Sequence, residues 1–450
     1  MPPRRRSRAS EEAAGSGPAA PDPAWVLAGR GFVRGRLTPL EVGISEEGTI
    51  AAIGRDLRAP RRHDVGDAII LPSATDLHVH FREPGGSRDV EGFATGTVQA
   101  ALGGVGLVGD MPNTDPAVRD PDGIDQKLRL FRGRAAIDVA LFGMLAVGSD
   151  VAGLGRTASA FKLYLSPTSG VDEPPDHAAV ADLLERAAGT GLAVSVHAED
   201  AARFPPPGEP PTDLEGWDRA RPPDAEATAV EEILRAAPPD LRLHIAHVTQ
   251  PSIADRLRAA GHSFEATPHH LLLSTASRLG TEGKVNPPLR SEATRQELWD
   301  RFRSGAVPIV ASDHAPHARA DKSRPFATAP SGMPGAQTMV PLLLERVRAG
   351  DLPLPTLVAT AAERPALWLG QPRGRIVPGF RADLIVVDFR DRRPIRGREL
   401  AGPCGWSAFE GRPAVFPREH YLGGEKIVQD AEYVGVARGV LRRPDYARAA

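Results

Sequence analysis

With 450 residues, the chain is long enough for a large hydrophobic core and at least one domain of ordinary size. Its 55 lysines and arginines nearly balance 57 aspartates and glutamates, so no overall basic field points to nucleic acid or a membrane surface. The single cysteine, Cys404, excludes an internal disulfide, and no apolar run reaches the roughly 20 residues of a spanning helix. These features indicate a cytoplasmic globular protein.

The first segment, residues 1–23, is rich in arginine, alanine, proline, serine and glycine. It lacks the apolar stretch of a secretory signal. Its composition predicts a disordered tail. A targeting or polyanion-binding arm built on Arg4, Arg5 and Arg6 is the alternative.

Residues 24–72 alternate short apolar runs with glycine and proline turns, as in VRGRLTPLEVGISEEGTIAAIG. This texture is typical of short antiparallel strands. It returns near the C-terminus in RADLIVVD and again in GVARGVLRR. We therefore expect residues 24–72 and 370–443 to pair into one small flanking β domain.

Between these segments, over residues 73–369, strand-like apolar runs alternate with helical patterns. The eight expected strands end near His80, Asp110, Phe142, Lys162–Leu165, His197, His247, Thr267 and Asp313. Helices are expected at residues 176–188, 225–236, 252–260, 293–303 and 339–348. This alternation predicts an α/β fold, a closed (β/α)8 barrel of the TIM type.

An open, doubly wound sheet is the alternative to the barrel. Such a sheet would bind a nucleotide at a glycine-rich turn after its first strand, and no G-x-G-x-x-G stands there. The glycine-rich stretch GGVGLVG precedes or lies within a strand instead. A proline-rich insertion, residues 201–223, follows the fifth strand, and the sequence favours neither a lid nor a simple excursion.

Several metal-competent side chains end these strands. His78 and His80 point to the same face, because strand side chains alternate. His197, His247 and Asp313 end other strands, and convergence from several rigid elements is what a metal ion needs. Two half-buried structural histidines are the alternative for the first pair. The pattern predicts a metal site at the mouth of the barrel.

Lys162, in AFKLYL, is the unusual member of this set. An ammonium group among cations is electrostatically unfavourable. A lysine carboxylated by CO₂ would instead give a carbamate that bridges two metals, and zinc suits a catalytic site of this kind. The alternative is a lysine paired with a carboxylate, since Asp110 and Asp313 end other strands. We expect Asp313 to bind one metal and to accept a proton from the attacking water.

Longer motifs carry a family resemblance. They are, in chain order, DLHVHFREPGG, EGFATGT, DMPNTDP, FKLYL, VHAED, EATPHHLLLS, KVNPPLR, ASDHAPH, GMPGAQTMVPLLL and WSAFEG. From about Trp25 to Arg443 the chain resembles dihydroorotases of the amidohydrolase superfamily, and most of all the dihydroorotase domain of multifunctional pyrimidine-synthesis proteins. The resemblance implies a zinc-dependent cyclic amide hydrolase that interconverts N-carbamoyl-L-aspartate and L-dihydroorotate in de novo pyrimidine (UMP) biosynthesis.

The resemblance also implies a role for each metal ligand. His78 and His80 would hold the first of two zinc ions, and His197 and His247 the second. N6-carboxylated Lys162 would bridge them. Asp313 would bind the first metal and act as the catalytic proton shuttle.

Dihydroorotate carries a free carboxylate, which calls for a guanidinium and neutral donors. Arg82, two residues beyond His80, shares the face of the metal ligands. Together with Asn113 and His317 it matches the carboxylate clamp of the family, and Asn286 is expected to face the substrate ring. A surface ion pair for Arg82 and a turn role for Asn113 are the alternatives.

Allantoinases and dihydropyrimidinases or hydantoinases also carry a lysine at the position of Lys162, so such a cyclic amidohydrolase is one alternative function. Another is a non-catalytic partner of aspartate transcarbamoylase, but such chains lose ligands and this one keeps six. Thr168 stands where the resembling domain has a mobile loop with a threonine, and we assign it no role. A homodimer and an association with aspartate transcarbamoylase are left open.

Overall fold

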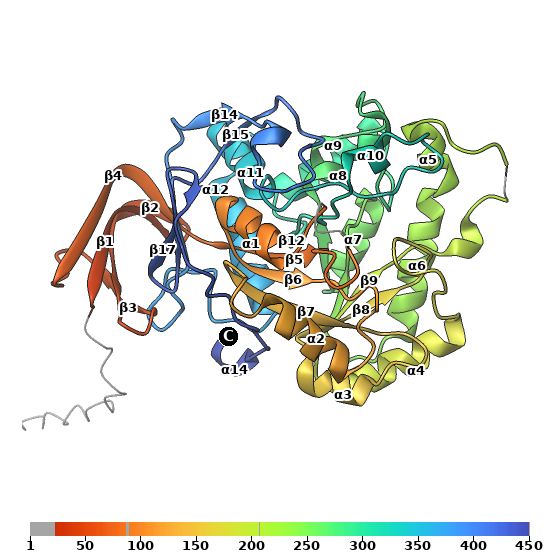
Figure 1. Ribbon diagram of the computed structural model, residues 1–450, viewed down its shortest axis with the longest axis horizontal. Helices are drawn as coiled ribbons and strands as arrows, with labels where there is room; N and C mark the ends of the chain where they lie inside the picture. The colour runs from red at the N-terminus through yellow and green to blue at the C-terminus, as the bar shows by residue number, and fades with distance from the viewer. Residues whose placement is uncertain (1–22, 87–89, 207, 450) are drawn as a thin grey trace, which may run out of the picture.

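The computed structural model describes residues 23–86, 90–206 and 208–449. Its central feature is an eight-stranded parallel sheet in which the strands follow one another in chain order. Helices surround the outside of this sheet (Figure 1). The strands are β5 (Ala74–Val79), β6 (Val105–Asp110), β7 (Asp138–Met144), β8 (Ala160–Tyr164), β9 (Val194–His197), β10 (Leu243–Ile245), β11 (Ser263–Ala266) and β12 (Ile309–Val310). The expected (β/α)8 barrel is confirmed.

The segment after β12 closes the barrel against β5. The backbone N–H of His80 donates to the carbonyl of His314 at 2.8 Å, and Val79 forms a parallel bridge with His314. The barrel is therefore sealed immediately beside the expected metal ligands. Nearly every strand residue is buried, as expected for strands covered on both faces.

The five helices expected from the sequence are present within two residues of their expected ends. They are α4 (His177–Ala188), α6 (Pro223–Ala236), α7 (Pro251–Ala259), α9 (Glu292–Arg303) and α11 (Met339–Arg348). Asp176 caps α4 and Ser291 caps α9, each accepting a backbone N–H from the first turn. Apolar faces of these helices pack on the barrel, as Leu183, Leu184 and Leu298 do.

Further short helices complete the layer around the barrel. They are α1 (Phe93–Leu102), α2 (Pro121–Phe131), α3 (Val151–Thr157), α5 (Leu214–Ala220), α8 (Pro268–Leu272), α10 (Arg319–Lys322), α12 (Leu354–Val358) and α13 (Arg364–Trp368), with α14 (Tyr446–Ala449) near the C-terminus. No helix in the described ranges is both long and apolar enough to cross a membrane.

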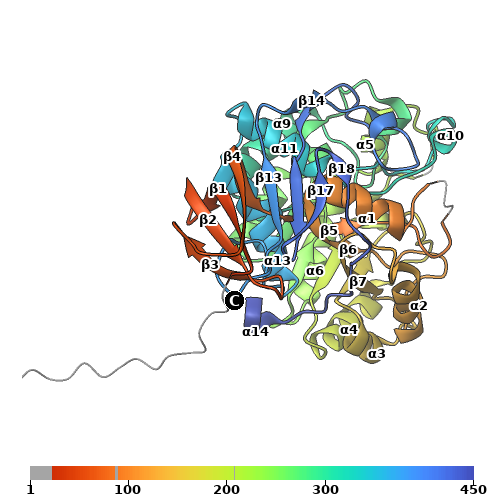
Figure 2. The same cartoon turned by 60° about the vertical axis from the view of Figure 1, so that its left-hand side comes forward.

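A second eight-stranded sheet joins the two ends of the chain (Figure 2). Its strands, in spatial order, are β18 (Glu432–Tyr433), β17 (Glu425–Gln429), β16 (Glu419–Leu422), β13 (Leu384–Val387), β4 (Arg61–Pro72), β1 (Trp25–Val33), β2 (Arg36–Ile44) and β3 (Ile50–Gly54). The N- and C-terminal segments meet where β13 pairs antiparallel with β4. A small ribbon of β14 (Arg392–Pro394) and β15 (Pro413–Val415) lies apart from this sheet.

The motif RADLIVVD contains β13 and lies in this sheet, as expected. The expectation for GVARGVLRR, residues 435–443, holds only at its start, where Gly435 donates to the carbonyl of Ile427 in β17, because residues 439–442 run along the barrel instead. The backbone N–H of Val139 in β7 donates to the carbonyl of Val440, and Arg442 pairs with the buried Asp138 at 2.7 Å. The buried carboxylate holds the segment there. The boundaries of the flanking domain stay a prediction, and residues 1–22 of the expected tail lie outside the described residues.

Candidate metal centre and active site

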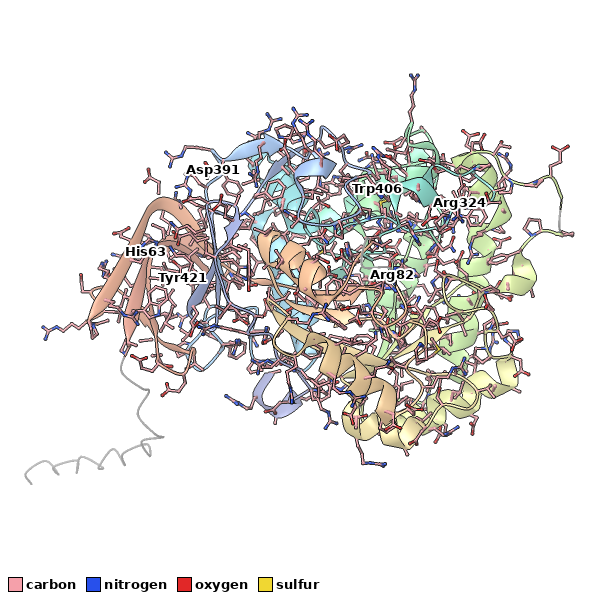
Figure 3. The ribbon with its side chains drawn as sticks, in the orientation of Figure 1. His63, Arg82, Arg324, Asp391, Trp406 and Tyr421 are labelled. Carbon is pink, nitrogen blue, oxygen red and sulfur yellow. The ribbon has the colours of Figure 1, made fainter. Side chains whose placement is uncertain are left out.

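A small cavity lies at the carboxyl ends of the barrel strands, where the polar residues of the sequence motifs come together. Its volume is about 30 Å³, which suffices for only about two water molecules. It is lined by His78, His80, Arg82, Asn113, Tyr164, Thr168, Ser169, His197, His247, Asn286, Asp313, Ala315, Ser331 and Gly332. Figure 3 places Arg82 over the barrel, away from His63 and Tyr421 of the flanking sheet.

The first predicted ligand group forms a compact cluster. The Nε2 atoms of His78 and His80 each lie 3.3 Å from Oδ1 of Asp313. All three side chains are buried, and one ligand atom of each fits within 4.8 Å of the others. Burial lowers the pKa of His78 to about 4 and that of His80 well below its usual value. Both imidazoles are therefore neutral, which is the form that binds a metal ion.

Hydrogen bonds on the far side of each ring direct these histidines. Nδ1 of His78 lies 2.6 Å from Oε1 of Glu265, and Nδ1 of His80 lies 2.8 Å from Oδ1 of Asn113. Because both acceptors are oxygens, the Nδ1–H groups donate and the Nε2 lone pairs face Asp313. This orientation by an outer hydrogen bond is typical of metal-binding histidines.

The second predicted pair lies next to the first. Nδ1 of His197 is 2.9 Å from Nε2 of His247. Nε2 of His197 donates to Glu199 at 2.8 Å, which leaves the lone pair on Nδ1. The rings of His78 and His247 are 5.4 Å apart between centroids, so the two groups form one continuous site. Burial lowers the pKa of both His197 and His247.

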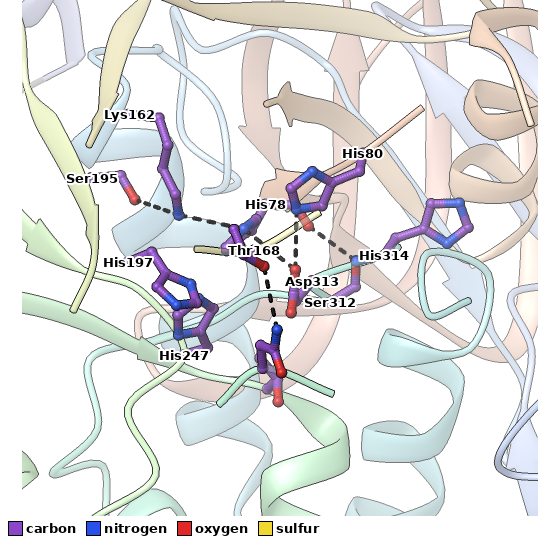
Figure 4. A network of polar contacts seen from close by, with 12 residues as sticks. His78, His80, Lys162, Thr168, Ser195, His197, His247, Ser312, Asp313 and His314 are labelled. Carbon is purple, nitrogen blue, oxygen red and sulfur yellow. Dashed lines mark hydrogen bonds and ion pairs between the residues drawn. The ribbon is translucent and has the colours of Figure 1, made fainter. Parts of the chain in front are cut away.

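Lys162 extends toward these histidines from β8 (Figure 4). Its Nζ lies 3.4 Å from Nε2 of His78 and 3.5 Å from Oγ of Ser195. Within the described parts of the chain it forms no ion pair, and Asp110 pairs with Lys127 at 2.6 Å instead. The structure therefore contradicts the alternative of a paired lysine. Burial lowers the pKa of Lys162 to about 8, which favours the neutral amine that carboxylation requires.

The backbone is strained at three positions of the site. Arg82 has φ of 62°, His247 of 38° and Asp313 of 46°, all in the left-handed region that residues other than glycine rarely adopt. Such conformations cost free energy and persist where the surrounding structure enforces them, most often at functional sites. The strain turns these side chains toward the cavity at the points where strands end.

Of the three predicted carboxylate contacts, Arg82 and Asn113 line the cavity, whereas His317 contacts Arg82 and is not a lining residue. The Arg82 guanidinium is 3.5 Å from Nε2 of His317, which donates to the carbonyl of Ser331 at 2.8 Å. Burial lowers the pKa of His317 to about 3, so this imidazole is a neutral donor. Arg82 makes no ion pair with a described residue, and its buried Nε lacks a partner there. The surface ion pair considered for Arg82 is not found among the described residues.

Two asparagines complete the predicted contacts. Asn113 accepts from His80 and donates to the carbonyl of Ser169 at 2.7 Å, so its amide links a metal-ligand candidate to the loop after β8 and does more than form a turn. The amide of Asn286 is 3.4 Å from Oγ1 of Thr168, while its buried Oδ1 has no partner among the described residues. Thr168 and Ser169 thus cover the cavity.

Sequence reasoning assigned no role to three residues of the site. Glu199 and Glu265 orient His197 and His78, and both stand in motifs that were noted, VHAED and EATPHHLLLS. Both glutamates lie at the ends of barrel strands near histidines, and this position could have indicated their role from the sequence. The hydroxyl of Tyr164 is buried in the cavity lining without a described partner, and only the structure reveals it.

Comparison with known proteins first gives a class. A model described as "Amidohydrolase family" matches residues 136–399, more than half of the chain, and one described as "Dihydro-orotase-like" matches residues 67–200. A barrel with clustered histidines and an aspartate at its strand ends fits that class, and the chain is an amidohydrolase.

Curated relatives then give the particular family. A dihydroorotase of Halobacterium salinarum is 40% identical over 367 residues, which cover 80% of this chain and 86% of that protein. A dihydroorotase of Methanosarcina acetivorans is 33% identical over 428 residues, covering 88% of this chain and 90% of that one. The chain belongs to the dihydroorotase family.

Solved structures agree with the fold. An L-hydantoinase (dihydropyrimidinase) from Arthrobacter aurescens superposes with a TM-score of 0.86 at 24% identity, covering 93% of this chain and 99% of that one. A dihydropyrimidinase from Brevibacillus agri gives 0.82 at 25% identity, covering 93% and 98%. These matches support the barrel and the flanking sheet.

Proposed function

We propose that this protein is a dihydroorotase, which interconverts N-carbamoyl-L-aspartate and L-dihydroorotate in de novo pyrimidine synthesis. The observation that carries the proposal is the guanidinium of Arg82 on the same cavity as the histidines and Asp313. In a substrate ring with a cyclic amide and a free carboxylate, the amide would lie at the histidines and Asp313, and the carboxylate would lie at Arg82. The dihydroorotases among its relatives support the same activity.

We infer that the metal centre would hold two zinc ions. His78, His80 and Asp313 would be ligands of the first, His197 and His247 would be ligands of the second, and a carboxylated Lys162 would serve as a shared ligand. The oriented imidazole lone pairs and the unpaired buried amine support this assignment. When bound, the two metals supply a lowered pKa for the attacking water and polarisation of the amide carbonyl.

Asp313 is the residue that moves the proton in this proposal. Its Oδ1 lies between the facing nitrogens of His78 and His80, at the floor of the cavity. In ring opening the carboxylate takes a proton from the attacking water and passes it to the departing amide nitrogen. Ring closure runs the same transfer in reverse.

Arg82, Asn113 and His317 hold the substrate carboxylate, and Asn286 faces the ring. The guanidinium supplies a charge-assisted contact, and the single N–H of neutral His317, which donates to the carbonyl of Ser331 in this structure, would turn to the substrate carboxylate. Allantoin and dihydrouracil carry no carboxylate, so they would leave this guanidinium unpaired in a largely closed site, which costs free energy. The structural likeness to hydantoinases concerns the fold and does not outweigh this contact.

A non-catalytic role is disfavoured because the chain keeps every predicted ligand and brings them together. A homodimer and an association with aspartate transcarbamoylase stay predictions. The clustered, buried ligand set favours the active enzyme over a purely structural partner.

Replacement of Arg82 tests the proposed function. Arg82→Met should lower kcat/KM for dihydroorotate by roughly tenfold to a few hundredfold, because a charge-assisted contact contributes about 1.5–3 kcal/mol. Any slow rate on dihydrouracil should hardly change. Arg129→Met, an exposed arginine of α2, is the matched control and should behave as wild type. Wild-type efficiency of Arg82→Met on dihydroorotate would overturn the assignment.

A further inference from the structure

The proline-rich insertion, residues 201–223, supports the site from outside. It contains a short 3-10 turn at Ala201–Arg203 and helix α5, and none of its described residues lines the cavity. The indole Nε1 of Trp217 donates to the carbonyl of Val285 at 2.9 Å, directly before Asn286. The sequence left two roles open for the insertion, a lid and a loose excursion. Its described part does not line the cavity and is bonded to the segment before Asn286, so it fits neither role.

Arg221, at the end of α5, makes the insertion's main contact with the metal centre. Its Nε and one terminal nitrogen donate to Glu199, at 3.0 Å and 2.6 Å. Glu199 in turn accepts the Nε2–H of His197 at 2.8 Å. The guanidinium of Arg221 therefore contacts His197, a ligand of the proposed second metal, through Glu199. It holds the Glu199 carboxylate, which in turn fixes the tautomer of His197.

The same guanidinium also reaches the loop that covers the cavity. A terminal nitrogen donates to Oγ of Ser166 at 3.0 Å, at the start of the segment that carries Thr168 and Ser169. Thr168 and Val171 close that segment with two backbone hydrogen bonds, at 3.0 Å and 2.9 Å. One planar group therefore bridges Glu199 and the root of the covering loop.

Packing leaves Arg221 little freedom to move. The residue is 6% exposed, and its guanidinium lies 4.5 Å from the ring centroid of Phe204 and 5.8 Å from that of Trp217. Its backbone carbonyl accepts from Arg290 at 2.7 Å, and Arg290 also donates to Thr249, two residues beyond His247. The insertion is thereby connected to the strands of both proposed second-metal ligands.

We propose that Arg221 is a positioning residue: it sets the affinity of the second metal through Glu199 and couples that site to the covering loop through Ser166. This inference rests on the proposed two-metal centre. Lysine cannot replace the residue, because a point charge lacks the planar fork that serves both acceptors at once.

The test uses the full-length, zinc-loaded protein. Metal is titrated out with a chelator, and backbone hydrogen exchange is followed over residues 166–171. Arg221→Gln should lower the affinity of one of the two metals by about tenfold or more, as the loss of outer hydrogen bonds to ligands usually does. The other metal should stay bound as in wild type, and the amides of Thr168 and Val171 should exchange faster.

Three further variants sharpen the outcome. Arg219→Gln, an exposed arginine of the same helix, should leave metal affinity and exchange unchanged. Ser166→Ala should accelerate hydrogen exchange in the loop without lowering the affinity of either metal. If Arg221→Gln does not fold, this variant tests the proposed coupling of Arg221 to the loop. Arg221→Lys should bind one metal more weakly than wild type and should show faster loop exchange. If Arg221→Gln does not fold, this variant tests the proposed effect on metal affinity.

The failures can be told apart. A wild-type chain that binds fewer than two metals would refute the two-metal centre on which the inference rests. If Arg221→Gln binds both metals with wild-type affinity and its loop exchanges at the wild-type rate, the inference is overturned and the two-metal centre is unaffected. Arg221→Lys is judged in the same way if Arg221→Gln does not fold. Equal weakening of both metals together with a lower melting temperature would show general support of the fold, and would also overturn it.

Discussion

His197 and His247 face each other with 2.9 Å between Nδ1 of the first and Nε2 of the second. Because Glu199 accepts the single N–H of neutral His197, the lone pair on Nδ1 of His197 accepts a hydrogen bond from Nε2–H of His247. This contact holds the two rings side by side next to the cluster of His78, His80 and Asp313. The pair is therefore placed where the proposed second metal would bind.

Lys162 is predicted to carry a carbamate. Its amine is buried, has a pKa lowered to about 8 by burial and forms no ion pair in the described chain. Protein equilibrated with ¹³C-labelled CO₂ should give a carbamate carbon signal that is missing in Lys162→Ala. That variant should lose activity and recover part of it with short carboxylic acids. Full activity of Lys162→Ala without such acids would contradict the bridge.

Asp313→Asn should keep the fold and most metal binding but lose turnover. The amide oxygen can still coordinate, whereas the amide cannot take up a proton at working pH. Loss of a general base costs roughly 10²–10⁴ in rate, and a weakened metal would add to that. Steady-state kcat with dihydroorotate measures the effect, alongside metal content. A rate within tenfold of wild type would remove Asp313 from proton transfer.

Glu265 is expected to hold the first metal indirectly. It contacts Nδ1 of His78 at 2.6 Å and Nε2 of His244 at 3.0 Å. Glu265→Gln removes the negative charge behind His78, and zinc affinity should fall roughly 10–100-fold. Chelator competition measures this affinity. Glu297→Gln, an exposed position on α9, is the control, and equal affinities in the two variants would argue against the role.

His420 gives a pH prediction away from the site. It is fully buried against Ser73 and the carbonyl of Ala101, and burial lowers its pKa to about 4. In the unfolded chain the pKa is about 6.5, so only the unfolded state takes up a proton between these values. Stability should therefore be lost as pH falls from about 6.5 toward 4, by up to about 1.4 kcal/mol per pH unit for this group.

Urea unfolding of the metal-free protein at several pH values checks this prediction. His420→Gln should have a shallower pH dependence than wild type, whatever its absolute stability. An unchanged slope in His420→Gln would contradict the sign or the size of the effect.

The barrel and the ligand candidates could be predicted because they depend on local pattern. Strand periodicity placed His78 and His80 on one face, and the ends of successive strands in a barrel meet at one mouth. The supporting contacts could not be predicted in the same way. Glu265 reaches His78 across 187 residues of sequence, and Arg221 reaches Glu199 from an insertion whose path the sequence does not define.

The C-terminal segment shows the same limit. The alternation in GVARGVLRR suits a strand of the flanking sheet, but the ion pair of Arg442 with the buried Asp138 holds the segment on the barrel. Asp138 also pairs with Arg373, so its environment is fixed by two distant parts of the chain. A short alternating run does not reveal which neighbour it will pair with.

One measurement tests the central claim most directly: ultraviolet-monitored turnover of L-dihydroorotate by the purified, zinc-loaded protein, beside allantoin and dihydrouracil under the same conditions. With Arg82 and the histidine cluster on one cavity, the highest kcat/KM is expected for dihydroorotate, with the reverse reaction from N-carbamoyl-L-aspartate also catalysed. A higher kcat/KM for allantoin or dihydrouracil, or no turnover of dihydroorotate by protein holding both metals, would contradict the account.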